Sequence, residues 1–421
     1  MTTGTSKPKR PAIRGTSRQD VSATSAPEPD LDAALDRVLK LMAIPGKSCE
    51  EGKVVEFITS QLRKAGAPAA AIVTDDAHKK TPHGGETGNL IFTLPGTIRA
   101  PRRLLMAHMD TVPLCVGCQP TLKGQYVRSA DKQTGLGADD RAGCAVALTA
   151  AIEILRRKLP HPPLTFFWPA QEEIGLYGAH FAKLSLLKKP RLAFNWDGGP
   201  AEKLTIGATG AYRIAVEIQG LASHAGGAPE QGVSAIAVAG LAIAELERHG
   251  WLGDVRKGDR RGTSNIGVIQ GGAATNVVTD RVLIKAEARS HDPRFRREIL
   301  KAIEQAFQHA AGAVRNAAGV QGKVRLTSRL DYEAFRLDAQ EPCVLAAEQA
   351  VRAAGAESLR AISNGGLDAN WLTAHGIPTV TLGCGQQNAH TVSEMLDVKA
   401  FRLACRIALR LATATEEHSE G

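Results

Sequence analysis

The sequence predicts an α/β protein in which a mostly parallel sheet is flanked by helices and interrupted by a smaller α+β unit. Between residues 89 and 197, apolar strands alternate with helices, which is typical of parallel strands joined by covering helices. From Tyr212 the pattern changes to alternating strands mixed with long helices, and from Arg336 the first pattern resumes. A chain of 421 residues is long enough to form both units.

The composition is that of an ordinary globular protein. The apolar fraction of 43% suits normal cores, and no apolar run is long enough to span a membrane. The N-terminus lacks the apolar core of a signal peptide, so we expect a cytoplasmic protein without a membrane partner. Seven scattered cysteines predict reduced thiols. Cys115 and Cys118 form a CxxC that we interpret as incidental loop thiols, with a redox or metal role as the lesser alternative.

The formal net charge of +9 raises the question of a nucleic-acid partner. However, the basic residues are dispersed, aromatic residues make up only 4% of the chain, and no nucleic-acid-binding motif is present. We therefore expect no nucleic-acid partner. A basic enzyme that attracts anionic substrates accounts for the charge equally well.

The elements of the first unit follow from apolar spacing and from residues that begin or end helices. Residues 1–29 are rich in Thr, Ser, Pro, Lys and Arg, and this composition predicts a disordered basic tail. Ser48 and Glu51 have the spacing of a capping box, which would begin the second helix. In chain order, the spacing predicts helices at 31–42 and 54–62, strands at 89–94 and from 104, a helix at 138–158, a strand at 164–168, a short helix at 179–187 and a strand at 192–196.

The inserted unit lies between the two changes of pattern and is assigned to residues 207–328. Its predicted elements are a strand at 212–218, a helix at 233–246, strands at 263–269 and 281–289, a helix at 294–314 and a strand at 324–330. The α/β pattern then returns with a helix to about 353, a strand at 359–362, a helix after 368, a strand at 379–382 and a helix at 398–412. We therefore predict that residues 30–206 and 329–416 form one discontinuous domain.

Residues able to carry chemistry follow several of the predicted strands. The apolar strand that begins at Leu104 runs into His108 and Asp110, which point to the same side because they are two apart on an extended chain. Alone, this pair would suit a strand that merely ends in polar residues. Further acidic residues and a histidine follow at corresponding places, namely Asp139 and Asp140, Glu172 and Glu173, Asp197, and His390.

A metal centre would explain why such groups recur. Open α/β sheets bind ligands beyond the carboxyl ends of their strands, so these groups can face one crevice although they are far apart in sequence. So many carboxylates would raise one another's pKa values unless cations neutralise them. Two histidines beside three or four carboxylates suit zinc, with manganese or cobalt as alternatives. We expect two divalent ions about 3.5–4 Å apart that share a carboxylate, as is usual in hydrolases.

Five short motifs carry these groups: Ala107–Pro113, Gly137–Gly143, Gln171–Gly175, Asn195–Gly199 and Gln387–Glu394. In this order they resemble the motifs of the co-catalytic zinc metallopeptidases that include peptidase T, carboxypeptidase G and aminoacylase. The Ala-Asp-Asp sequence and Asp197 are most similar to the peptidase T branch. The resemblance covers essentially everything after the tail, and it implies a zinc-peptidase-like catalytic domain with an inserted lid or dimerisation domain.

The resemblance also implies a role for each side chain. Asp110 would sit behind one metal-binding histidine and set its tautomer and basicity. Glu172 would be the general base that takes a proton from the attacking water and delivers it to the leaving amine. Taken alone, the Glu172–Glu173 pair would also suit a solvated loop. The implied metal ligands are His108 and Asp197 on one ion, Glu173 and His390 on the other, and Asp139 as the bridge.

In the inserted unit the resemblance points to three further residues. His224 matches the histidine that reaches a partner's active site and stabilises the tetrahedral oxyanion. Asn276 and Arg289 match positions that help to hold the substrate's carboxylate, a task that suits the two-pronged guanidinium. Each of the three also suits an ordinary packing or turn residue. Closure of this lid would exclude water from the reaction.

The glycine-rich segment at Gly365 and Gly366 resembles the family's substrate-binding loop. It departs from the usual peptidase T form because Leu367 stands where that form has threonine. The resemblance therefore does not extend to a strict preference for tripeptides.

The sequence thus predicts a two-metal hydrolase of amide bonds, with a di- or tripeptide aminopeptidase as the favoured activity. The alternatives on the same scaffold are an N-acyl-amino-acid amidohydrolase and a carboxypeptidase. A non-catalytic metal-binding protein is the rival from another class, and Glu172 argues against it because a binder needs ligands but no general base. The resemblance also implies a small peptide as substrate and a homodimer formed through the inserted domain.

Overall fold

A computed structural model describes residues 1–2 and 27–413 of the chain. Most of the predicted tail and residues 414–416 of the predicted first domain therefore lie outside the described residues. The helices are α1 (Leu31–Ala43), α2 (Gly52–Lys64), α3 (Ala138–Arg157), α4 (Tyr177–His180), α5 (Ala235–Arg248), α6 (Pro293–Ala313), α7 (Pro342–Ala353), α8 (Asp368–Ala374) and α9 (Val398–Thr413). No helix in these ranges is both long and apolar enough to cross a membrane.

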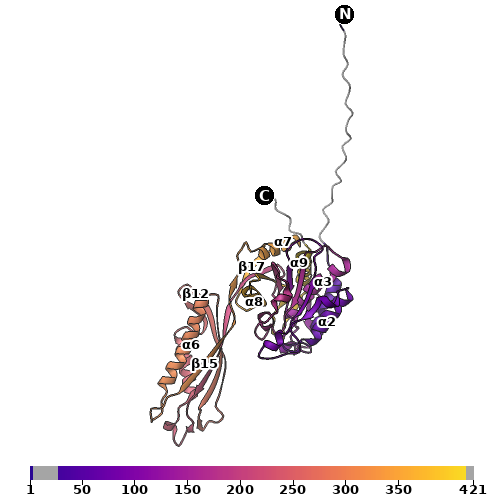
Figure 1. Cartoon of the computed structure of the whole chain (residues 1–421). Coiled ribbons are helices and arrows are strands. Elements are labelled where there is room, and N and C mark those ends of the chain that lie inside the picture. Colours follow the sequence, from indigo (N-terminus) through magenta and orange to yellow (C-terminus); the bar gives the residue numbers. More distant parts are fainter. Residues whose placement is uncertain (3–26, 414–421) are drawn as a thin grey trace.

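A large nine-stranded sheet forms the first body of the molecule, the rounded one in Figure 1. Its strands are β1 (Ile72–Thr74), β2 (Leu90–Leu94), β3 (Arg103–Met106), β6 (Leu164–Trp168), β7 (Leu192–Trp196), β8 (Lys203–Ala208), β16 (Phe335–Arg336), β17 (Leu359–Ser363) and β18 (Thr379–Leu382). They are ordered β1-β2-β6-β3-β7-β18-β8-β16, and β17 also pairs with β8. The central strands β6, β3, β7 and β18 are parallel, whereas strands nearer the edges pair mainly antiparallel.

The apolar runs in the sequence explain this arrangement. Every residue of β3, β6, β7 and β18 is buried, as expected for parallel strands covered by helices on both faces. The helix α3 is buried on nearly all sides because it packs between the sheet and its neighbours α1 and α9. The predicted α/β class with a mostly parallel sheet is confirmed.

A second body, elongated in Figure 1, contains a five-stranded antiparallel sheet ordered β11-β12-β14-β9-β15. These strands are β9 (Gly210–Gln219), β11 (Gly253–Lys257), β12 (Arg260–Gly271), β14 (Arg281–Ser290) and β15 (Lys323–Tyr332). The helices α5 and α6 cover one face, where alternate strand residues pack around Phe295 and Phe307 in a separate core. The predicted limit at residue 328 falls inside β15, because β15 keeps pairing with β9 as far as Tyr332.

Two smaller sheets position loops that matter later. A four-stranded sheet joins β4 (Pro120–Lys123) and β5 (Tyr126–Ser129) to β20 (Met395–Asp397) and β19 (Gln386–Gln387). A short antiparallel pair, β10 (Ser223–His224) and β13 (Val277–Val278), forms a separate two-stranded sheet. Segments far apart in sequence are thereby held side by side.

The predicted capping box is wrong. The helix α2 begins at Gly52 without a side-chain cap, and the Ser48 hydroxyl instead donates to Asp110 Oδ2 at 2.6 Å. Glu51 is buried and accepts the backbone N–H groups of Cys49 and Gln171. Tertiary partners therefore take both side chains that the spacing assigned to a helix end.

Two other boundaries also shift. The predicted short helix at 179–187 is two separate pieces, α4 and a 3-10 turn at Leu184–Leu187. The last residues of the predicted tail are among the described ones, and Glu28 there forms ion pairs with Arg406 and Arg410 of α9.

The second core generates the first prediction. Phe307 is fully buried there, so Phe307→Ala should lower the free energy of unfolding by about 3–5 kcal/mol. Leu283→Ala, on the exposed side of the same sheet, should change it by less than about 0.5 kcal/mol. Urea unfolding followed by circular dichroism compares the two variants, and equal effects would contradict this account of the core.

Candidate active site

The topology of the large sheet brings the predicted site residues to one edge. The strands β3, β6 and β7 are adjacent and parallel, so the chain leaves each of them on the same side. His108 follows β3 by two residues, Asp197 follows β7 directly, and Glu172 and Glu173 come four and five residues after β6. The sequence predicted this convergence from the strand ends alone.

Asp139 lies between the two histidines. Its Oδ1 is 3.2 Å from His108 Nε2, and its Oδ2 is 3.4 Å from His390 Nε2. His390 Nε2 also lies 2.9 Å from Glu173 Oε2. One carboxylate therefore faces a histidine with each oxygen, which is the geometry that a bridging ligand needs.

Two overlapping groups of side chains are arranged to hold metal ions. His108 with Asp139 and Glu173 forms one group, and His108 with Glu172 and Asp197 forms the other. Within each group the potential ligand atoms lie within 4.8 Å of one another. With His390 beside Asp139 and Glu173, all five predicted ligands and the predicted base meet in one crevice.

Buried negative charge dominates the electrostatics of this crevice. Burial raises the pKa of Glu173 to about 7, of Asp197 to about 6 and of Asp368 to about 8, and it raises that of Glu172 well above its usual range. For Asp139, burial also favours the neutral form, but hydrogen bonds with the two histidines outweigh it and lower the pKa. Neighbouring carboxylates in the crevice also repel one another. Cations would relieve this repulsion, and the mixed nitrogen and oxygen donors fit divalent metal ions.

Asp110 organises the centre from behind. Its two carboxylate oxygens accept the backbone N–H groups of Glu172 at 2.9 Å and Glu173 at 3.1 Å. The hydroxyl of Ser48 donates to the same carboxylate, and His108 Nδ1 lies 3.4 Å from it. Asp110 therefore contacts both the imidazole and the loop that carries the two glutamates.

Glu394 is a buried residue whose role the sequence reasoning missed. Its carboxylate accepts the backbone N–H groups of Leu136 and Gly137 at 2.7 Å each and of Asp139 at 3.0 Å. Glu394 belongs to the same loop as His390, so it ties that loop to the segment that presents Asp139. Its place in the last quoted motif was the available signal, since a buried acid there needs partners.

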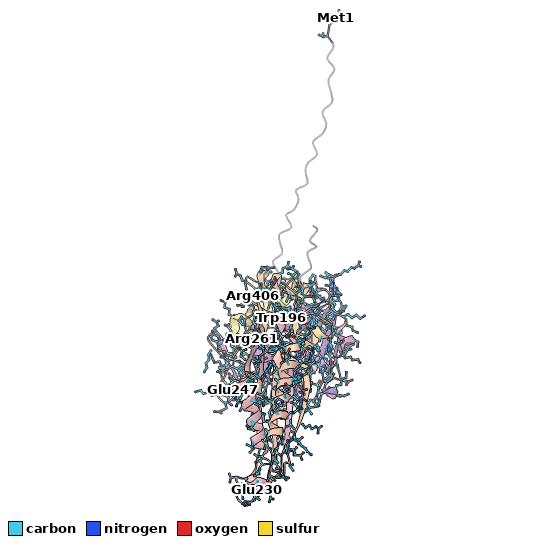
Figure 2. All side chains as sticks on the ribbon, turned by 90° about the vertical axis from the view of Figure 1, so that its left-hand side faces the viewer. Met1, Trp196, Glu230, Glu247, Arg261 and Arg406 are labelled. Carbon is cyan, nitrogen blue, oxygen red and sulfur yellow. The ribbon has the colours of Figure 1, made fainter. Side chains whose placement is uncertain are left out.

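The residues predicted in the inserted unit lie in two separate places. His224 and Asn276 are neighbours, because the Ala225 N–H donates to the carbonyl of Asn276 at 2.9 Å. Figure 2 shows Glu230, in the loop after His224, at the end of the molecule away from Trp196, which precedes Asp197. Within one chain, His224 and Asn276 therefore stand apart from the crevice.

Arg289 lies at the other end of β14. Its Nη1 donates to the carbonyl of Asn364, next to Gly365 and Gly366, at 3.4 Å. Asn276 lies beyond the Arg281 end of this strand, and at about 3.3 Å per residue that end is roughly 25 Å from Arg289. A single chain cannot bring Asn276 and Arg289 to one carboxylate.

A cleft of about 710 Å³ joins the crevice to the exposed face of the five-stranded sheet. Glu173 and His83 line it from the first body, and Arg213, Lys285 and Arg329 line it from the second. This volume accommodates a small peptide beside the candidate metal ligands.

Comparison with known proteins identifies the family. Residues 104–414 match the profile of peptidase family M20/M25/M40. The chain belongs to this family. The predicted resemblance to the peptidase T-like metallopeptidases is thereby confirmed. This M20-family chain is an enzyme that hydrolyses amide bonds.

Individual relatives agree with this assignment. YqjE of Bacillus subtilis (strain 168) is 33% identical over 366 residues, which span 87% of this chain and 93% of YqjE. Peptidase T of Serratia proteamaculans (strain 568) is 25% identical over 93% of this chain and all of its own length. The structure is similar to that of a tripeptidase from Staphylococcus aureus subsp. aureus Mu50, with a TM-score of 0.81, 30% identity and coverage of 92% and 99% of the two chains.

A second solved structure points the same way. It is the aminopeptidase PepT of Bacillus cereus ATCC 10987, with a TM-score of 0.78 and 29% identity. The similarity covers 91% of this chain and 98% of that one. Both bodies of the M20-family chain thus have counterparts in peptidases of known structure.

Replacing Glu394 tests its positioning role in this peptidase. In Glu394→Gln the amide nitrogen cannot accept a hydrogen bond, so backbone groups next to Asp139 lose a partner. We expect the affinity for zinc to fall about 10- to 100-fold with little change in the melting temperature. Competition with a chromophoric chelator, starting from metal-stripped protein, measures this affinity.

Glu50→Gln is the matched control for that experiment, because Glu50 is exposed and, within residues 27–413, forms an ion pair with Lys47 alone. It should bind zinc as the unmodified protein does. A Glu394→Gln protein with undiminished zinc affinity would show that the loop holds Asp139 without this carboxylate.

Proposed function

We propose that this protein is a two-metal aminopeptidase that hydrolyses di- and tripeptides. The observation that carries the proposal is the meeting of the predicted ligands around the carboxylate of Asp139, beside a cleft that fits a small peptide. The likeness to a tripeptidase and an aminopeptidase, each at about 30% identity, supports the substrate class. Zinc is the proposed metal because of the mixed imidazole and carboxylate donors.

The residues divide the chemistry between them. Bound at His108, Asp139, Glu173, Asp197 and His390, two divalent ions would polarise the scissile carbonyl and make a water molecule more acidic. Glu172, beside His108, accepts a proton from the attacking water and later passes it to the leaving amine. Asp110 keeps Glu172 in place by accepting a hydrogen bond from the backbone N–H of Glu172.

Arg289 is the proposed anchor for the substrate's terminal carboxylate. Its Nε and one terminal nitrogen donate to the two oxygens of Glu287 at 2.9 and 3.0 Å. The remaining terminal nitrogen reaches only the carbonyl of Asn364, at 3.4 Å. This arrangement leaves donor capacity directed at the glycine-rich loop, and it supports carboxylate binding there.

His224 is suited to stabilise an oxyanion, but in a partner's active site. Its Nδ1 accepts the backbone N–H groups of Gly226 at 3.1 Å and Gly227 at 2.9 Å. The neutral imidazole therefore carries its proton on Nε2, which can donate to a developing negative charge. Because His224 stands apart from the crevice of its own chain, the proposal requires a second copy.

A homodimer through the second body is therefore part of the proposal. Residues 265–271 of β12 have no strand partner on their outer edge among the described residues, since β11 pairs only with residues 260–264. Ile269 on this edge is 52% exposed, and Ile236 and Leu241 of α5 are 49% and 51% exposed. An open edge beside an exposed apolar helix face suits pairing with an identical surface.

We also propose that the enzyme works in the cytoplasm. All seven cysteines are unpaired thiols, and six of them are buried. Cysteines that remain reduced are typical of a reducing compartment. A small peptide, rather than a nucleic acid, is the proposed partner of its basic surface.

A substrate panel tests the proposed activity directly. Purified protein is incubated with dipeptides, tripeptides and N-acetyl amino acids, with and without zinc, manganese or cobalt. Metal-dependent release of N-terminal residues is the expected result. Turnover of the N-acetyl amino acids alone would instead identify an amidohydrolase.

Replacing Glu172 separates the general base from the metal ligands. Glu172→Gln should lower kcat by about 10²- to 10⁴-fold, because the amide cannot carry the proton. Metal content, measured by atomic emission on the dialysed protein, should stay near that of the unmodified enzyme. Undiminished hydrolysis with metal retained would remove Glu172 from this role.

The dimer is tested by placing a charge on its proposed surface. Ile236→Glu should convert a dimer to a monomer in sedimentation velocity at micromolar concentrations, because a carboxylate would be buried against an apolar face. Leu345→Glu, at an exposed apolar site on α7 of the first body, should leave the dimer intact. A monomeric unmodified protein at these concentrations would refute the proposal.

Mixing two inactive variants tests the contribution of His224 across the dimer. Glu172→Gln and His224→Ala chains, refolded together in equal amounts, should form mixed dimers with one complete site each. Random pairing predicts recovery of roughly a quarter of full activity. Recovery is expected only if His224 serves the partner's crevice, so absence of recovery from verified mixed dimers would place its role elsewhere.

A further inference from the structure

The exposed face of the five-stranded sheet carries charged residues in defined rows. Strand pairing aligns Val268, Lys285, Ala215 and Thr327 in one row across β12, β14, β9 and β15. The neighbouring row, toward the first body, holds Asn265, Glu287, Arg213 and Arg329. Residues of both rows line the cleft that also contains Glu173.

Lys285 is a cation without an ion pair among the described residues. In its own row it is flanked by small or apolar side chains. The two acids closest to it along and across the strands are already engaged, since Glu287 holds Arg289 at 2.9 Å and Glu217 holds Arg281 at 2.8 Å. Its charge is therefore available to a ligand in the cleft.

Two arginines add to the positive character of this wall. Arg213 and Arg329 share one carboxylate, that of Asp331, at 2.5 and 3.0 Å. Arg213 also lies 3.8 Å from Glu287, the acid that holds Arg289. Three guanidinium groups against these two acids leave a net positive charge. Arg213 lies diagonally across from Lys285 on the adjacent strand, a separation of about 7–8 Å that long side chains span easily.

We propose that Lys285 and Arg213 form a subsite for a substrate carboxylate that is distinct from the position assigned to Arg289. Lys285 and Arg289 are four positions apart on β14, which is about 13 Å along the strand, so the two cations hold different groups. The ligand is either the terminal carboxylate of a longer peptide or an acidic side chain. This inference rests on the proposed peptidase activity.

The subsite gives the enzyme a preference for peptides with a carboxylate at this position, which the hydrolytic reaction itself does not require. Peptides whose carboxylate reaches the second body gain a charge-assisted contact while their scissile bond lies at Glu172. Neutral peptides of the same length lack it. The positively charged wall also raises the rate at which anionic peptides enter the cleft, and added salt should weaken both effects.

Lys285→Gln, combined with matched substrates, tests the proposal as a double-mutant cycle. Tetra-alanine is compared with its C-terminal amide, and Ala-Glu-Ala with Ala-Gln-Ala, by measuring kcat and KM for each. We expect Lys285→Gln to raise KM about five- to tenfold for the carboxylate-bearing member of one pair, with kcat nearly unchanged. Its neutral counterpart should change less than about twofold.

The pair that responds identifies the source of the carboxylate. Loss of discrimination in the tetra-alanine pair assigns the chain terminus, and loss in the Glu/Gln pair assigns the side chain. Lys285→Arg should restore the preference because it keeps the charge. Lys323→Gln is the matched control, since Lys323 is an exposed lysine on the same side of the sheet but at the outer end of β15, outside the cleft.

The two levels of inference fail in different ways. If no peptide is hydrolysed by the unmodified enzyme with any metal, the proposed function is wrong. If peptides are hydrolysed but Lys285→Gln affects charged and neutral members of both pairs equally, the carboxylate subsite is wrong and the peptidase assignment stands.

Discussion

The concentration of buried carboxylates around Asp139 is the constraint on which the rest of the structure depends. Parallel strands deliver these acids to one sheet edge, and burial alone would hold several of them in the neutral form. The acids divide into two kinds. Asp110 and Glu394 are satisfied by backbone N–H groups, whereas Asp139 and Glu173 face histidines and one another. The first kind holds the loops in place, and the second kind needs cations.

Part of the site could be predicted from the sequence because the strands that carry it could be predicted. The strands at 164–168, 192–196 and 379–382 have the predicted bounds because each is a short, mainly apolar run rich in β-branched or aromatic residues, which is typical of a buried strand. Once those strands are placed as parallel neighbours, the residues after them must share an edge. His108, Glu173 and Asp197 could therefore be grouped without coordinates.

Other features depend on contacts that no local pattern encodes. Ser48 and Glu51 have capping-box spacing, yet their partners are Asp110 and the backbone of Gln171, far away in sequence. Glu394 has no local reason to be buried, and its function is evident only when the loop before Asp139 is folded against it. Leu184–Leu187 was merged with the preceding helix because short apolar stretches do not show where a helix ends.

The strand β14 belongs to the second body and contacts the first. It carries residues proposed to bind substrate, but none proposed to bind metal. One end places Arg289 beside the glycine-rich loop of the first body, its middle presents Lys285 to the cleft, and the segment before it leads to Asn276 and His224. A paired strand in the middle of a sheet is rigid, so these positions stay at fixed intervals. Groups near Arg289 can act within one chain, whereas those near Asn276 can act only where another crevice meets them. In the proposed mechanism, loops of the large sheet carry the catalytic chemistry, and distances along a strand with no proposed metal ligand set the choice of substrate.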